Sequence, residues 1–405
     1  MAKNKLNRFL AMESETIIEQ RLEGAEESTV DVETAAEELG EVEEALDESL
    51  DVHDELSALA NQVQTDADNG KLSAEALGYA NALAKVHLSR VGLGGLRTGM
   101  ESTYSPEGIG SRIKEVWEMI KRLAKQLYEK LTAFFKSIFS DAEKLEKKAE
   151  ATKEEATSSE FKRKESGANA LPKIQVRQSF AALFHKGATT ESVLNDLQSG
   201  QQNIAKLVKE YWPKLVTYRC ELVAFLLKEV ATAASSPDSY KYPEMSENWN
   251  IPNFGLTETE RDSDRIAALD LPLDHAFEVV VSHSGAHANT WKITPKSTQD
   301  DTSSVGELVD CPTGGKLAEF SAITILLSAY ARSINKDGQK IADLAKTISA
   351  LKIPDSDNPE IKKLADSLKR ITENLTKESV GLSKYLQSTA RAVAAFSDEV
   401  LGMFL

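Results

Sequence analysis

Two histidines four residues apart, His283 and His287, have a spacing that could hold a metal ion if they lay on a helix. They fall instead within residues 276–296, AFEVVVSHSGAHANTWKITPK, where apolar stretches flank a turn of Gly, His and Asn. That pattern predicts a small β-hairpin. No glutamate stands in the HExxH arrangement of a zinc protease. We therefore expect no metal, although an enzyme site near His275, His283 and His287 stays open as an alternative.

The other residue types that could take part in catalysis do not form a recognisable catalytic pattern. Glycines 92, 94, 95 and 99 look like a phosphate-binding loop, but no strand precedes them and no GK[ST] follows. No Ser, His and Asp combination lies in a recognisable nucleophile context. Cys220 and Cys311 are far apart in sequence and are expected to be free thiols in a reducing compartment. We predict a non-enzymatic protein with no catalytic residue, no cofactor and no metal.

The clearest structural element is SPEGIGSRIKEVWEMIKRLAKQLYEKLTAFFKSIF, residues 105–139. Its apolar residues recur every three or four positions, which predicts an amphipathic helix. Between 112 and 136, seven Lys and Arg stand against three Glu. Packing within the molecule or an assembly, membrane contact and nucleic-acid contact all fit this pattern, and we prefer packing. The candidate docking face is Trp117, Ile120, Leu127, Phe134 and Phe135, and the candidate polyanion contacts are Lys114, Lys121, Arg122 and Lys125.

The formal net charge of −16 is distributed unevenly along the chain. Residues 11–60 hold 18 Asp and Glu and one Arg, so this acidic block repels nucleic acid and anionic membranes. Residues 30–64 also have a heptad-like rhythm, which favours a bundle helix or a coiled-coil assembly seam. The stretch 91–110 is rich in glycine and turn formers and is expected to be an exposed joint.

These patterns predict a mainly α fold, with long amphipathic helices and a helical body that carries one small β-hairpin. No run of about 18 apolar residues occurs, so no bilayer-spanning helix is expected. Residues 141–166 are expected to be helical at best and then linker-like, and 235–262 to form a long loop. Further helices are expected near 72–91, 191–234, 317–350 and 359–405. The expected domains are an acidic helical arm (1–101), a basic amphipathic helix with a charged linker (102–166) and an α-rich body (167–405).

An acidic helical arm, a short Gly-rich joint, the helix IGSRIKEVWEMIKRLAKQLYEKLTAFFKSIF and a helical remainder together resemble the internal head proteins of large tailed bacteriophages, in particular the virion structural proteins of jumbo myophages. The likeness covers roughly residues 1–150. It implies a structural role in the prohead core, in several copies or as a homo-oligomer, with capsid and other core proteins as partners. It also implies a place in the virion head interior, after assembly in the host cytoplasm.

The resemblance further implies that a prohead protease removes an N-terminal propeptide. Such proteases cut after Glu where a small or aliphatic residue stands two positions earlier. The motif also fits at Glu13 and Glu75, so accessibility rather than the motif favours the joint. We prefer Glu101, because Pro106 beside the second bond restricts the backbone. The two candidates inside the joint are Gly99-Met100-Glu101 and, as second choice, Ser105-Pro106-Glu107.

A cut after Glu101 would remove most of the negative charge. Residues 1–101 hold 22 acidic and eight basic residues, so 42 acidic and 40 basic residues would remain, a net charge of −2. The basic helix would then lead the chain and could face the packaged DNA. The alternative function is an ejected virion protein that acts on the host membrane through residues 111–139.

Overall fold

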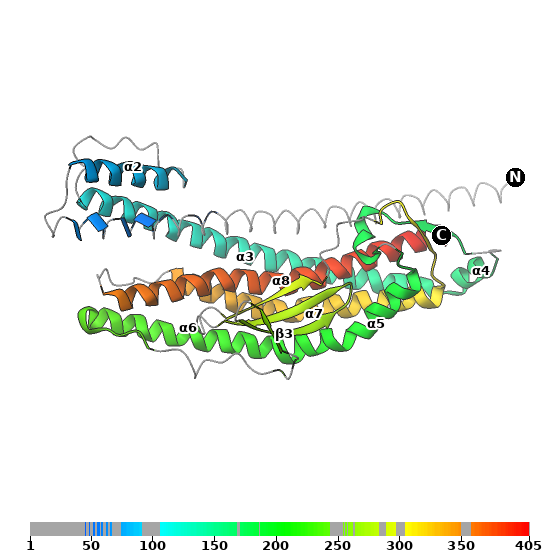
Figure 1. Ribbon diagram of the computed structural model, residues 1–405. Coiled ribbons are helices and arrows are strands. Elements are labelled where there is room, and N and C mark those ends of the chain that lie inside the picture. The colour runs from blue at the N-terminus through cyan, green and yellow to red at the C-terminus, as the bar shows by residue number, and fades with distance from the viewer. Residues whose placement is uncertain are drawn as a thin grey trace.

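The computed structural model describes residues 74–90, 106–167, 171–185, 187–243, 258–261, 264–282, 289–296, 304–349 and 358–404, with single positions inside 45–66 and at 254 and 256. The fold is mainly α, as the sequence predicts. Its long helices run along one common direction, and a small sheet lies beside them (Figure 1). The candidate cleavage residues Gly99 to Ser105 and the histidines His283 and His287 lie outside the described residues.

Three long helices, α3 (Pro106–Ala156), α7 (Gly314–Ser349) and α8 (Pro359–Phe404), form the centre of the molecule. α7 runs antiparallel to α3, because the Asn335 side chain donates to the Phe135 carbonyl at 2.7 Å while Arg332 pairs with Glu146 further along α3. α8 runs parallel to α3. Its register is marked by two ion pairs seven residues apart on each helix, Asp141 with Arg391 and Lys148 with Asp398.

The second half of α3 corrects the expectation for residues 141–166. The helix continues to Ala156, and the short helix α4 (Ser159–Gly167) follows it. The stretch was expected to be helical at best and then linker-like because it is rich in Lys and Glu, but its inner face consists mostly of small residues. Residues before and after position 167, where the α-rich body was expected to begin, therefore share one hydrophobic core. The buried residues of this part of α3 are Asp141, Ala142, Leu145, Ala149, Thr152 and Ala156.

The helix expected at 191–234 is a continuous rod made of α5 (Thr190–Lys206), the π turn η2 (Leu207–Tyr211) and α6 (Trp212–Ser235). Pro213 gives a physical reason for the π turn. A proline has no N–H, and inside an α-helix its ring collides with the carbonyl four residues earlier. That carbonyl belongs to Lys209, within the wider turn, so the rod passes the proline without breaking.

The expected hairpin is present as β4 (His275–Val281) and β5 (Thr290–Pro295), with Val279 opposite Trp291. Two further antiparallel strands, β2 (Glu258–Arg261) and β3 (Asp264–Leu271), extend it to a four-stranded sheet. The expectation of a loop through residue 262 is therefore wrong at its end. A second, two-stranded sheet pairs β1 (Lys173–Gln175) with β6 (Leu308–Asp310).

The remaining elements connect or flank these layers. Helix α2 (Ala74–Arg90) lies near the end of the molecule at which α3 begins (Figure 1). The described positions between 45 and 66 that have an assigned structure are helical, which agrees with the periodicity of the acidic block. Two short 3-10 turns, η1 (Gln178–Leu183) and η3 (Pro237–Ser239), lead into and out of the α5–α6 rod.

A substitution at Gly200 tests how closely the sheet packs on the rod. A Cβ at Gly200 of α5 would overlap the ring of Pro272, which is rigid, in the turn after β3. We expect Gly200→Ala to lower the free energy of unfolding by about 1–3 kcal/mol despite the better helix propensity of alanine. Gly381, inside α8, has no neighbour within 4 Å of that position. Gly381→Ala should raise the free energy of unfolding by about 0.5–1 kcal/mol, and equal effects in urea unfolding would contradict the close packing.

Candidate functional site

The candidate docking face on α3 is partly closed by the protein itself. Phe134 and Phe135 are buried, with their rings 5.7 Å apart and edge-to-face, and Phe135 packs beside Gly338 of α7. These two residues are therefore core in this structure rather than an outward surface. The side chains of Trp117, Ile120 and Leu127 lie outside the described ones.

Among the candidate polyanion contacts, only the Lys125 side chain is described, and it is 78% exposed. Lys114, Lys121 and Arg122 lie on α3, but their side chains are outside the described part. Further along α3, four more lysines face the solvent. With Lys125 they give the helix an outer surface on which cations recur, interspersed with glutamates. These lysines are Lys136, Lys144, Lys147 and Lys153.

The second-choice cleavage residues have a clear position. Pro106 and Glu107 form the first turn of α3, whereas α2 ends at Arg90. Proteases bind their substrates in an extended conformation, so a bond inside a helical turn must first unwind. This position makes Glu107 a poorer site than one that precedes the helix.

His275 contacts a backbone carbonyl and an aromatic ring. Its Nδ1 lies 2.6 Å from the Leu273 carbonyl, and its ring packs on Tyr385 of α8 at 5.2 Å between centroids. Among the described residues, no three His, Cys, Asp or Glu side chains come together as metal ligands would. Burial raises the pKa of the Cys311 thiol to about 12, so this cysteine is a packed core residue with little thiolate at neutral pH.

The turn that joins β3 to β4 is held in an uncommon conformation. Leu273 and Asp274 have φ values of 57° and 56°, a region that residues with a Cβ rarely adopt. The Asp196 carboxylate of α5 accepts a hydrogen bond from the Leu273 N–H at 2.7 Å. The Tyr385 hydroxyl of α8 donates to the Pro272 carbonyl at 3.1 Å. The turn therefore fixes the sheet between α5 and α8, and its strain has a structural explanation.

The most unusual polar group in the described core is Arg219 on α6, whose side chain is fully buried with that of Glu378 on α8. The Arg219 Nε donates to Glu378 Oε2 at 3.1 Å, and Nη2 donates to Oε1 of the same carboxylate. Nη2 also donates to the Asn289 carbonyl at 2.8 Å, just before β5. The guanidinium lies 4.9 Å from the centre of the Trp291 ring, a cation–π contact. One ion pair thus joins the α6 rod, the sheet and α8.

The electrostatics of this centre favour a structural role. Burial raises the pKa of Glu378 to about 7, because desolvation of the carboxylate outweighs the attraction of Arg219 and the hydrogen bonds from Thr290 and the Trp291 backbone. Burial also raises the pKa of the Tyr218 hydroxyl, which accepts a hydrogen bond from the Asn289 side chain at 3.0 Å. The carboxylate is engaged by its neighbours.

Sequence reasoning missed this centre. Arg219 stands inside the apolar run of α6, and a lone arginine in such a run indicates a buried partner. Its partner is 159 residues away in sequence, so only the fold could identify it.

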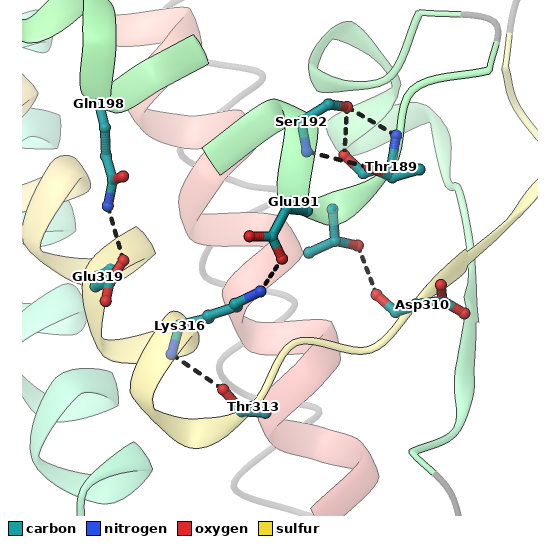
Figure 2. Close-up of polar contacts among 9 residues, drawn as sticks. Thr189, Glu191, Ser192, Gln198, Asp310, Thr313, Lys316 and Glu319 are labelled. Carbon is teal, nitrogen blue, oxygen red and sulfur yellow. Dashed lines mark hydrogen bonds and ion pairs between the residues drawn. The ribbon is translucent and has the colours of Figure 1, made fainter. Parts of the chain in front are cut away.

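The N-termini of α5 and α7 meet at one end of the body and form a second polar cluster (Figure 2). Thr189 and Ser192 form a reciprocal capping box at the start of α5. Lys316 in the first turn of α7 pairs with Glu191 in the first turn of α5. Helix N-termini attract anions. Here Glu191 and its neighbours occupy the space, and the remaining contacts are Thr190 to the Asp310 carbonyl, Gln198 to Glu319 and the Gly314 N–H to Glu165.

One helix is apolar enough to cross a membrane by length and composition. Gly314–Lys340 of α7 contains an 18-residue window of mean hydropathy 1.2, which differs from the expectation that no such stretch occurs. Half of this window is buried inside the protein, where α7 packs on α3 and α8. The core helix of a globular protein passes the same test, and we interpret α7 in that way.

Removing one member of the buried ion pair should be costly. We expect Arg219→Met to lower the free energy of unfolding by about 3–5 kcal/mol at about pH 8, because it leaves the Glu378 carboxylate buried and unpaired. A carboxylic acid whose pKa is raised in the folded state stabilises the fold at low pH, and this contribution is lost as the pH rises towards the raised value. The loss should therefore be smaller at about pH 5 than at about pH 8.

The control for this prediction is the double variant Arg219→Met with Glu378→Gln, which has no ionisable group at the site and keeps a hydrogen-bond acceptor. Its own free energy of unfolding should vary less between the two pH values than that of Arg219→Met. Chemical denaturation at the two pH values measures both. If Arg219→Met is equally destabilised at both pH values, the carboxylate is not held in a dry environment.

A model of the phiKZ-like phage internal head proteins matches residues 13–398, which include the acidic block, α3 and nearly all of the body. No curated protein matches the chain, and no solved structure does. The match extends the likeness seen in residues 1–150 across almost the whole length. The chain belongs to the phiKZ-like phage internal head proteins.

Proposed function

We propose that this internal head protein is a non-enzymatic core component that is cut in the joint at 91–110 and then packed with the genome. The observation that carries the proposal is the segregation of charge. Residues 1–101 have a formal charge of −14, whereas the rest of the chain has −2. Such segregation along one chain means that a single cut changes how the protein interacts with a polyanion.

The structure supports the joint as the site of the cut and Glu101 as the preferred residue. Arg90 ends α2 and Pro106 begins α3, so a cut after Glu101 would fall between two helices. The product would keep α3 whole. A cut after Glu107 would require the first turn of α3 to unwind. The protease in this proposal is the prohead protease, acting in the host cytoplasm before the head matures.

Contact with packaged DNA is the expected result of the cut. Before cleavage, the 18 acidic residues of 11–60 would weaken the attraction of the chain for phosphate. After cleavage, exposed lysines such as Lys125, Lys136 and Lys144 could contact the DNA backbone, which carries no sequence information. The protein would act in many copies with capsid and other core proteins.

The alternative is an ejected protein that uses residues 111–139 on the host membrane. A membrane-surface helix must present its apolar side to lipid. Phe134, Phe135 and Ile138 of this segment are buried in the body, so its C-terminal part would have to leave α7 and α8 first. This burial is why we favour the role inside the head. Flotation with liposomes would detect the alternative directly.

Substitution of the two candidate glutamates tests the cut. We expect Glu101→Gln to leave a full-length chain in mature particles, because the protease requires the carboxylate before the scissile bond. Glu107→Gln is the matched control and should be processed like the wild type. Mass spectrometry of the protein from purified heads gives the N-terminus in each case. A wild-type chain that begins near Met1 would end the proposal.

A further inference from the structure

Three buried N–H donors lie beside the ion pair of Arg219 and Glu378. Among the side chains that the structure describes, Arg219 Nη1, Trp212 Nε1 and Trp291 Nε1 are buried and have no hydrogen-bond acceptor. The three residues are at most 1% exposed, so bulk solvent does not supply an acceptor either. A buried N–H group without an acceptor is rare in folded proteins and requires an explanation.

The three side chains are in contact with one another. The Arg219 guanidinium lies 4.9 Å from the centre of the Trp291 ring. The rings of Trp212 and Trp291 meet edge to face, with their centres 6.4 Å apart. An acceptor about 2.9 Å from each of two donors joins nitrogens up to about 6 Å apart. The contacts between these side chains are therefore of the size that one shared acceptor requires.

The chemistry of these groups means that they need an acceptor brought to them. Indole and guanidinium nitrogens donate hydrogen bonds and do not accept them. Both groups are planar and rigid, so their N–H groups cannot turn without moving the whole side chain. Thr132 and Ser328 also have buried oxygen atoms without a partner, but a hydroxyl rotates and can reach a carbonyl of its own helix.

The protein acceptors recorded in this centre are already engaged. The Glu378 carboxylate accepts from Nε and Nη2 of Arg219. It also accepts from Thr290 and from the Trp291 backbone. The Asn289 carbonyl accepts from Nη2 at 2.8 Å, and the side-chain oxygen of the same residue accepts from a backbone N–H at 2.9 Å. The centre thus has more donors than these acceptors serve.

We propose that this centre binds one small hydrogen-bond acceptor, a water molecule or a halide ion, through Arg219 Nη1 and the indole N–H groups of Trp212 and Trp291. The acceptor would join the start of α6 to β5 and complete the contact between the rod, the sheet and α8. A larger ligand such as phosphate would have to separate α6 from the sheet, because the three residues are buried. A buried water typically makes about three hydrogen bonds to otherwise unsatisfied groups.

Nuclear magnetic resonance of the full-length chain tests this site. The chain has four tryptophans, so isotope labelling of the indole nitrogens gives four N–H signals, and Trp212→Phe and Trp291→Phe assign two of them. In a gluconate buffer without chloride, we expect both signals to show a nuclear Overhauser cross-peak to a bound water. Titration with sodium chloride should leave both signals unchanged if water is the occupant, and should shift both with saturation if a halide is.

Trp212→Phe also tests whether the acceptor is shared. It removes one N–H and keeps an aromatic ring, so the water cross-peak or chloride shift of Trp291 should fall by about twofold or more. The matched control is Tyr211→Phe, which removes a hydroxyl that bonds the Phe254 carbonyl instead, at 3.4 Å. This neighbouring change should leave the response of both indoles as in the wild type.

A crystal structure of the wild type is a second measurement that needs no variant. We expect a density peak within about 3.2 Å of at least two of the three nitrogens, and an anomalous signal there after a bromide soak would identify a halide. Ordered side chains without such a peak would overturn the proposal. In solution, the proposal fails if neither indole responds to water or chloride, if only one does, or if Trp212→Phe leaves the Trp291 response unchanged.

Discussion

A charge that leaves water needs an opposite charge and a nearly complete set of hydrogen bonds, and this constraint shapes the body of the protein. Arg219 comes from the α5–α6 rod and Glu378 from α8, while Asn289 at the edge of the sheet supplies a carbonyl. Apolar contacts tolerate small shifts, but this centre is satisfied only when all three elements meet in one arrangement. The orientation of the rod and sheet relative to α8 follows from it.

The contact between α3 and α8 also depends on paired charges, which here are partly exposed. Asp141 pairs with Arg391, and one heptad later Lys148 pairs with Asp398 with the polarity reversed. A shift of α8 by seven residues would bring Asp141 towards Asp398, or Lys148 towards Arg391, and like charges repel. The register of α3 on α8 is thus specified by charge order as well as by packing. This matters for the proposed maturation, because α3 must stay attached to the body after the arm is removed.

Sequence periodicity predicted the long helices, since each has an apolar stripe at steps of three or four. It did not predict β3, because DRIAALDL mixes charges and alanines that have little preference for strands. Residues 141–166 looked helical at best and then linker-like, because the buried face of 141–156 is mostly alanine and threonine. For the candidate site, spacing correctly placed Phe134 and Phe135 on one apolar face, but it could not say that α7 covers them. The pairing of Arg219 with Glu378 depends on the tertiary fold and has no local signature.

The π turn at Leu207–Tyr211 has a geometric consequence for the whole body. A π turn contains about one residue more than an α turn, which rotates everything after it by about 100° around the helix axis. Before the turn, Asp196 of α5 accepts a hydrogen bond from the β3–β4 connection. After the turn, α6 carries Arg219, which pairs with Glu378. The extra residue sets the angle between these two side chains on a single rod. Deletion of the extra residue would leave both helices intact, but either Asp196 or Arg219 would then point away from its partner.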